Sequence, residues 1–523
     1  MTIQCDTATS TPEEIVQAEA PLPSKAGARE WLGLALLALP TLMLGLDLTF
    51  LPLTLPALAV DLQPTSTEAL WILDVSGFML GGFLITMGTL GDRIGRRRLL
   101  MIGMVAFAVA SSLAAFATST TMLIAARAAL GIAAATLMPS TLALISDLFR
   151  DPRERALAFG IWATLFGVGY ALGPAGGGFL IERFWWGAAF LIPVPLAALL
   201  LIFARSLLPE HRASDRASLD FLSVGLSLVA MLSTIHGVKE IARFGITPEA
   251  VIAISVGVAV GLVFVWRQNR LADPLLDLRL FSNRAFSASL IVLLVGLIAV
   301  GGTMMLTAQY LQLVAGQPPF LTGLWMGLAA LGMIAGGIGA PIIARRIRPG
   351  FVVASSLALS VMGYLMLAAV GQGVVDLGLV IAGLALAYLG NGAIAALGTD
   401  LVVGSAPPKK AGSASAMSET VQDIGVSLGI AILGSIATVI YRRTLFDSLP
   451  DALPEDIGVA VGDSLWAASA IAAELPAGLI EDARSAFVAG FHSAAIFSAV
   501  SVTVLVILAA VALRHVGTIG RSD

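Results

Sequence analysis

The chain has 523 residues, of which 58% are hydrophobic and 12% are charged, and its mean hydropathy is +0.93. A water-soluble protein averages about 25% charged residues, so this composition excludes a soluble globular protein and predicts that lipid surrounds much of the chain. The formal net charge of −4 and the lack of a basic block give no sign of a nucleic-acid partner. The single cysteine, Cys5, excludes an intrachain disulfide and a cysteine metal site, and the four histidines show no ligand spacing.

Apolar stretches of about 20 residues, the length that spans a bilayer as a helix, recur along the whole chain. They follow a polar tail of roughly thirty residues, which does not resemble a secretory signal. We therefore predict an all-α polytopic membrane protein with fourteen spanning helices, at 32–58, 69–91, 99–117, 120–146, 156–182, 187–206, 220–240, 248–267, 285–313, 320–343, 351–371, 377–404, 412–440 and 487–513.

Lysine and arginine set the expected orientation, because cytoplasmic loops of membrane proteins carry an excess of both. With the N-terminus in the cytoplasm, most of these residues fall on the cytoplasmic side. The outer side then holds only Arg183, Lys239, Arg243, Arg442, Arg443 and Arg484, and Arg127 lies within a span. An odd number of helices would destroy this asymmetry, so we expect both termini in the cytoplasm.

The predicted spans divide into two sets of six with two helices between them. We expect a cytoplasmic tail at 1–31, a six-helix half at 32–206, two inserted helices at 207–268, a second half at 269–513 and a tail at 514–523. The outer loop 442–486 is long and acidic, and its segments Val459–Ala473 and Gly478–Val488 have helical patterns. The loop is either a structured hairpin over the outer mouth or a simple tether.

The second span ends in a glycine-rich and basic loop. It reads Gly-Thr-Leu-Gly-Asp-Arg-Ile-Gly followed by three arginines, and its notable residues are Gly88, Asp92, Arg93, Gly95 and Arg96. Glycines let two helices meet closely, an acid can cap a helix N-terminus, and a basic run holds a loop on the cytoplasmic side. A loop that served orientation alone would not need the glycines and the acid. The pattern resembles the signature loop of the major facilitator superfamily, which implies a fold of two six-helix halves.

Three further patterns resemble one branch of that superfamily, the fourteen-helix drug:proton antiporters. They are Leu46-Asp47-Leu-Thr49 with Leu55-Pro56, Leu123-x-x-x-Arg127-x-x-x-Gly131, and Gly169-x-x-x-Gly173-Pro174-x-x-Gly177-Gly178. Trp71-Ile-Leu-Asp74 and Ser418-Glu419-Thr-x-x-x-Asp423 resemble the acidic signatures of the quaternary-ammonium, methyl-viologen and dye pumps. The resemblance implies export against protons. It also implies that the 169–178 glycines act in conformational change, and we expect them to contact a second-half helix.

Charged residues inside the membrane are the most informative, since each costs at least about 2.5–3.5 kcal/mol at a helix centre. Four acids, Asp47, Asp74, Glu419 and Asp423, are expected to face a central cavity with Arg127 as the one buried base. We expect Arg127 to contact an acid of the first half, with Asp47 as the first candidate. A neighbouring cation favours a charged carboxyl and burial disfavours it, so a cation and a proton can compete for one acid. We therefore expect proton coupling by Asp47, Arg127 and Asp423, and substrate binding by all four acids.

Aromatic side chains are the expected partners of a lipophilic cation, through their π faces. Trp71, Trp162, Phe166 and Tyr170 are the main candidates, and Phe78 and Trp325 are two more. Packing in the protein interior or against lipid is the alternative for each of them singly.

We therefore expect a proton-coupled exporter of lipophilic organic cations in a bacterial cytoplasmic membrane. Its expected partners are the substrate, protons and lipid, and it is expected to be a monomer without a metal. Export of an endogenous metabolite or a self-made antibiotic by the same mechanism is the alternative. An enzyme is not expected, because the sequence has no nucleophile–base pair and no soluble domain. The sequence also has no nucleotide-binding glycine loop, so we expect no cofactor and the proton motive force as the energy source.

Overall fold

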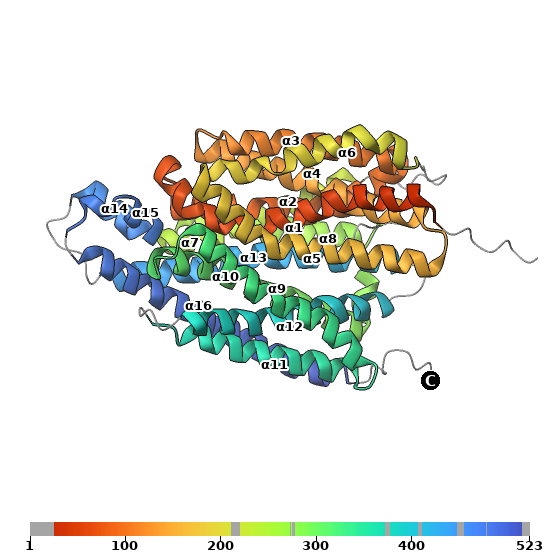
Figure 1. The fold of residues 1–523 in the computed structure, drawn as a ribbon. Coiled ribbons are helices and arrows are strands. Elements are labelled where there is room, and N and C mark those ends of the chain that lie inside the picture. The colour runs from red at the N-terminus through yellow and green to blue at the C-terminus, as the bar shows by residue number, and fades with distance from the viewer. Residues whose placement is uncertain are drawn as a thin grey trace, which may run out of the picture.

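A computed structural model describes residues 26–210, 220–271, 274, 278–371, 377–405, 411–446, 454–476 and 478–514. Within these ranges the chain forms helices and no β-strand. Fourteen helical segments of this described part are long and apolar enough to cross a membrane, which confirms the predicted fold class. They lie side by side in one elongated bundle, and α1 begins at the end where α16 finishes (Figure 1).

The first half and the two inserted helices follow one another with short connections. They comprise α1 (Ala28–Leu62), α2 (Ser66–Ile94), α3 (Arg96–Ala115), α4 (Thr120–Leu148), α5 (Pro152–Arg183), the 3₁₀ turn η1 (Trp186–Leu191), α6 (Pro193–Leu207), α7 (Phe221–Phe244) and α8 (Pro248–Gln268).

The second half begins with the 3₁₀ turn η2 (Leu278–Ser282). It continues through α9 (Arg284–Gln309), a π-helical turn η3 (Tyr310–Val314), α10 (Pro319–Ala344), α11 (Pro349–Ala368), α12 (Leu377–Gly404) and α13 (Ala411–Phe446). The short helices α14 (Glu455–Asp463), α15 (Leu465–Ala470) and η6 (Ala472–Glu474) then precede α16 (Leu479–Ala512).

Polar residues cap several of these helices at the positions where the apolar runs begin. Thr65 caps α2 by accepting a hydrogen bond from the Glu68 N–H, and the Glu68 carboxylate accepts one from the Thr65 N–H in return. Asp220 caps α7 and Asn283 caps α9 through the same kind of bond. Each cap satisfies backbone donors that the first helical turn leaves free, and so fixes where the span starts.

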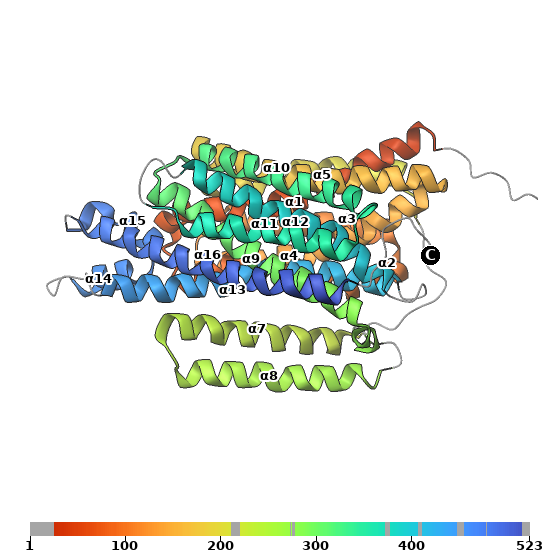
Figure 2. The same ribbon diagram turned by 90° about the horizontal axis from the view of Figure 1, so that it is seen from below.

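The inserted helices α7 and α8 pack against each other on one side of the bundle, where α7 contacts α2 and α13 (Figure 2). The two halves meet along two seams, one between α2 and α13 and the other between α5 and α10. The division of the chain into these units remains an interpretation, but the inserted pair is plainly peripheral to the bundle.

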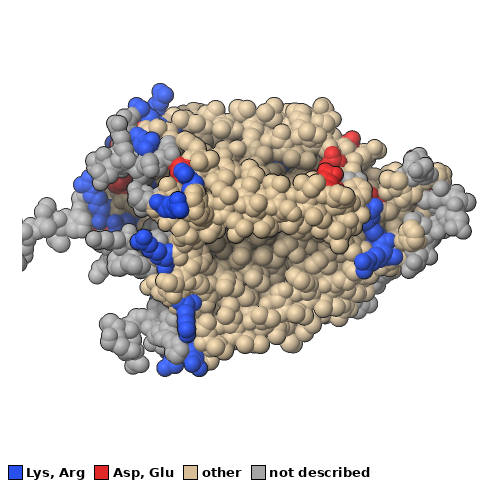
Figure 3. All heavy atoms as spheres, turned by 180° about the vertical axis from the view of Figure 1, so that it is seen from behind, with Lys and Arg blue, Asp and Glu red and all other residues tan. Residues whose placement is uncertain are grey.

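Basic side chains gather mainly at the end where α1 begins, and a broad band free of charge covers the middle of the face in Figure 3. We call this end the basic end and the other the opposite end. Gly95 lies at the basic end between α2 and α3 with φ +107°, a backbone conformation that favours glycine. Arg97 and Arg98 there lie 3.4 and 3.8 Å from the Glu210 carboxylate, which ties the signature loop to the chain after α6.

The outer loop is structured differently from the prediction. The segment Gly478–Val488 is not a separate hairpin helix, because α16 runs without a break from Leu479 into the last span. Helices α14 and α15 pack near the end of α1 instead, and the Asp463 carboxylate accepts hydrogen bonds from the Ser66 N–H and hydroxyl at 2.5 and 3.1 Å. The loop therefore joins the second half to the start of α2.

Candidate functional site

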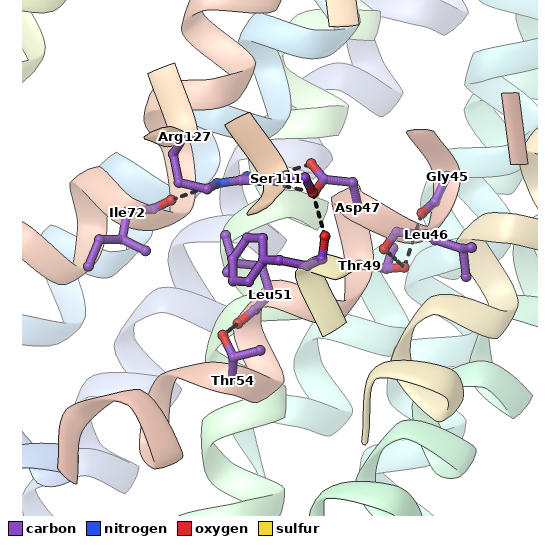
Figure 4. A network of polar contacts seen from close by, with 10 residues as sticks. Gly45, Leu46, Asp47, Thr49, Leu51, Thr54, Ile72, Ser111 and Arg127 are labelled. Atoms are coloured by element: carbon purple, nitrogen blue, oxygen red, sulfur yellow. Dashed lines mark hydrogen bonds and ion pairs between the residues drawn. The ribbon is translucent and has the colours of Figure 1, made fainter. Parts of the chain in front are cut away.

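An ion pair between Asp47 and Arg127 lies inside the first half (Figure 4). Arg127 Nη1 donates to Asp47 Oδ2 at 2.9 Å and to Oδ1 at 3.1 Å, and its Nε donates to the Ile72 carbonyl at 3.2 Å. Asp47 is 6% exposed and Arg127 is 3% exposed. The predicted contact is therefore present, and it ties α1 to α2 and α4.

Both members of this pair line a cavity of about 50 Å³ between the two halves. Phe166 from α5 and Asp423 from α13 line the same cavity, together with aliphatic side chains of α1 and α2. A volume of this size holds only water molecules or a small ion, so the cavity is too small for an organic cation in this conformation.

Asp423 is the unbalanced charge in this cavity. Asp47 is matched by Arg127, whereas Asp423 Oδ2 is buried and has no hydrogen-bond partner among the described residues. A buried carboxylate without a cation or a donor costs several kcal/mol, and either a proton or a bound cation removes that cost. The cavity wall thus offers one site that both species can occupy.

Glu419 precedes Asp423 by one helical turn, so both lie on one face of α13. Asp423 faces the cavity, and Glu419 lies nearer the basic end without lining the cavity wall. It therefore stands on the same helix face as the cavity acid but one turn away from it.

Asp74 does not lie in the central cavity, so its predicted position is wrong. Its carboxylate faces α7, where Oδ2 lies 2.7 Å from Lys239 Nζ and both side chains are 0% exposed. Trp71 covers this pair, with its ring 3.7 Å from Lys239 Nζ, and therefore is not a cavity residue either. Lys239 does not belong to an outer loop and Arg127 is not the one buried base, because a helix that continues to Phe244 carries Lys239 into the protein interior.

The remaining aromatic candidates fall into different places. Trp162 donates a hydrogen bond from Nε1 to the Thr141 hydroxyl at 3.2 Å, and the Tyr170 hydroxyl donates to Met304 Sδ at 3.4 Å. Phe78 is buried where α2, α7 and α13 meet, and Trp325 lies in α10 away from the cavity wall. Phe166 alone of the six lines the cavity.

The glycines of α5 lie mainly against α1 and not against a second-half helix, which corrects most of that prediction. A Cβ atom at Gly169, Gly173 or Gly177 would collide with Leu42, Thr49 or Phe50 of α1, respectively. Gly178 does meet the second half, at the Pro319 carbonyl of α10, and the Pro174 carbonyl approaches Gly323 of the same helix. The glycine run therefore permits two close helix contacts at once.

The contacts between the halves concentrate at the opposite end and near the middle. Gly178 and Gly323 join α5 to α10 there, and Gly77 and Gly434 join α2 to α13 through Ser427 and Leu70. Of the signature residues nearer the basic end, a Cβ at Gly88 would meet only Pro139 of the same half. The side chain of Asp92 lies outside the described part of the chain, and Arg93 and Arg96 lie at the end of α2 and the start of α3.

The sequence matches the model of a known protein family. Residues 37–430 match the family model of the Major Facilitator Superfamily. The chain belongs to this superfamily. It is therefore a multi-pass membrane transporter and not an enzyme.

Two relatives are a multidrug efflux pump and a methyl viologen resistance protein. The chain is 40% identical over 500 residues to the multidrug efflux pump LfrA of Mycolicibacterium smegmatis, covering 95% of this chain and 98% of that protein. It is 31% identical over 490 residues to the methyl viologen resistance protein SmvA of Salmonella typhimurium, covering 91% and 97% of the two chains. These matches confirm the resemblance to the drug efflux type.

A solved structure with the same fold is the bacterial homolog of the human lysosomal transporter Spinster in an inward-facing and unoccupied conformation. The TM-score is 0.65 at 15% identity, and the match covers 94% of this chain and 98% of that one. At such low identity the similarity concerns the fold alone.

Sequence reasoning missed two polar contacts of this major facilitator protein. Glu210 was not singled out, although two arginines of the signature loop converge on it. Lys239 was counted with the outer side because it lies at the last residues of the predicted span 220–240. Asp74 was the signal from which a buried Lys239 could have been predicted, since an acid within a span requires a cation or a proton nearby.

Proposed function

We propose that this transporter exports lipophilic organic cations in exchange for protons. The observation that carries the proposal is Asp423, whose Oδ2 is buried without a hydrogen-bond partner among the described residues, on the wall of a cavity whose other acid is already paired. A substrate cation and a proton can each neutralise the Asp423 carboxylate, but not both at once. This competition for one carboxylate is enough to couple export of the cation to import of the proton.

Orientation follows from charge. The basic end carries most of the lysines and arginines, and we place it in the cytoplasm of a bacterial cell by the rule that such residues stay inside. Both termini then lie in the cytoplasm. The functional unit is a monomer in this proposal, and the proton gradient across the cytoplasmic membrane is the energy source.

The position of Phe166 supports the proposal that the substrates are cations and not neutral molecules. Its ring lines the same cavity as Asp423, so a cation that binds once the cavity has widened can contact a π face and a carboxylate together. An anion would meet two carboxylates and one arginine that is already engaged. The charge balance therefore favours cations.

The test is transport by purified protein in liposomes under an imposed pH gradient. Ethidium, methyl viologen and a neutral dye of similar size serve as substrates. We expect the two cations to move against protons and to acidify the compartment they leave, while the neutral dye moves much more slowly. Equal transport of all three without a gradient would contradict the proposal.

A further inference from the structure

A second and larger cavity lies apart from the central one. It has a volume of about 400 Å³, within the range of roughly 300–1,000 Å³ that is usual for small-molecule sites. Residues from five helices line it, including Gly81 of α2, Ser227 of α7, Phe264 of α8, Ser287 of α9 and Thr420 of α13. The inserted helices α7 and α8 thus form part of its wall.

The cavity lies toward the basic end of the bundle. Ser287 is in the first turn of α9, Ser227 is in the second turn of α7, and Phe264 is in the last turns of α8. All three positions are near the basic end. With the orientation proposed above, the cavity lies at the depth of the cytoplasmic leaflet.

Among the described residues, its walls contain no lysine, arginine, aspartate or glutamate. A phosphate group would find no cation there, whereas an apolar chain finds aliphatic and aromatic contacts. The hydroxyl groups of Ser227 and Ser287 donate to backbone carbonyls of Val224 and Phe281. The buried Thr420 hydroxyl has no partner among the described residues and remains for a ligand.

Helix α13 connects this cavity to the acids. Met417, Thr420, Val421 and Ile424 face the apolar cavity at helical spacing, and Asp423 of the same helix faces the central cavity. Helices α2 and α13 pack tightly between the two cavities, because a Cβ atom at Gly81 would lie only 2.8 Å from Ile424 Cγ1. Separation of α2 from α13 at Gly81 would join the cavities.

We propose that this apolar cavity is the entry site for the hydrophobic part of the cationic substrate, taken from the cytoplasmic leaflet before its charge reaches Asp423. The site gives the two inserted helices a role in selecting lipophilic substrates. The orientation and the substrate class rest on the proposed function, but binding in the cavity can be measured without transport.

Two matched serines on the inserted helices allow a sharp test. Ser227 lines the cavity and Ser255 of α8 is exposed on the outside, and each hydroxyl donates to a carbonyl of its own helix. Ser227→Phe fills the cavity, and Ser255→Phe adds the same ring outside it. Ser287→Phe fills the cavity from α9, in case the first variant folds poorly.

Transport of tetramethylammonium and dodecyltrimethylammonium is measured in liposomes. We expect Ser227→Phe and Ser287→Phe to raise the KM for the long-chain cation about tenfold or more, because methylene groups lose their buried contacts, and to leave the short cation unchanged. Ser255→Phe should behave as the wild type. An equal effect of Ser227→Phe and Ser287→Phe on both cations, or no effect on either, would overturn the proposal.

Binding is measured independently with a dodecyltrimethylammonium that carries a photoreactive diazirine at the chain end. We expect it to label peptides of α7, α9 and α13 in the wild type and in Ser255→Phe, but not in Ser227→Phe. If a diazirine phosphatidylglycerol labels the same peptides and excess alkylammonium does not displace it, the cavity holds lipid and the proposal is wrong. Labelling as expected without any transport of cations would contradict the proposed function and leave the binding site intact.

Discussion

Lys239 Nζ lies 2.7 Å from Asp74 Oδ2, and neither side chain is exposed. The pair joins α7, an inserted helix, to α2 in the protein interior. It has no contact with the central cavity, so we assign it to holding the inserted helices in place and not to substrate binding.

Removing one member of this pair should destabilise the protein. Lys239→Met leaves the Asp74 carboxylate buried without its cation, at a cost of about 3–5 kcal/mol. We expect a lower thermal unfolding temperature in detergent and reduced transport. The double variant Asp74→Asn with Lys239→Met should recover most of both, and a double variant that is stable but inactive would return Asp74 to a functional role.

Arg127 is expected to be needed for transport more than for insertion. Arg127→Ala leaves Asp47 unpaired on the cavity wall, and Arg127→Lys keeps the charge but loses the planar geometry that reaches both the carboxylate and Ile72. We expect proton-coupled uptake to fall in the order wild type, Lys variant, Ala variant, with similar amounts of protein in the membrane. Full transport activity of Arg127→Ala would contradict a role of Arg127 in proton coupling.

Asp423 and Glu419 are expected to set tolerance for substrate charge. A dication can engage both acids or Asp423 together with another polar group, whereas a monocation needs one. Asp423→Asn should therefore impair transport of methyl viologen more than that of an ethidium-sized monocation, and Glu419→Gln should do so more mildly, since it does not line the cavity. Paired uptake assays measure the ratio, and an equal loss for both substrates would indicate proton transfer alone.

Gly173 is expected to tolerate no side chain. Leucine at this position would collide with Thr49 and the Leu46 backbone of α1 and so displace the adjacent Asp47. Gly176→Leu is the matched control on the same helix, because a Cβ atom there meets nothing within 4 Å. We expect Gly173→Leu to fold or transport poorly and Gly176→Leu to be close to the wild type. Normal transport by Gly173→Leu would show that the contact of α5 with α1 is dispensable.

The spans and one buried contact were predictable from the sequence for simple reasons. Twenty apolar residues form a helix in lipid because every backbone group must be bonded internally. The pairing of Arg127 with Asp47 followed because a deep arginine needs a nearby acid, and the superfamily resemblance placed their helices together.

Other features depend on helix rotation and helix ends, which a single sequence does not specify. Asp74 points to α7 instead of the cavity because the inserted pair packs on that face of α2. Lys239 looked like a loop residue because the apolar run ends near it, although the helix continues. The same ambiguity made the start of α16 look like a separate loop helix.

The central claim is that a proton and a cation compete for Asp423. The most direct measurement is proton release when tetraphenylphosphonium is added to purified protein in weakly buffered detergent solution. We predict that the wild type releases protons as it binds the cation, and that Asp423→Asn releases far fewer while Asp74→Asn with Lys239→Met releases as many as the wild type. Undiminished proton release by Asp423→Asn would contradict the account.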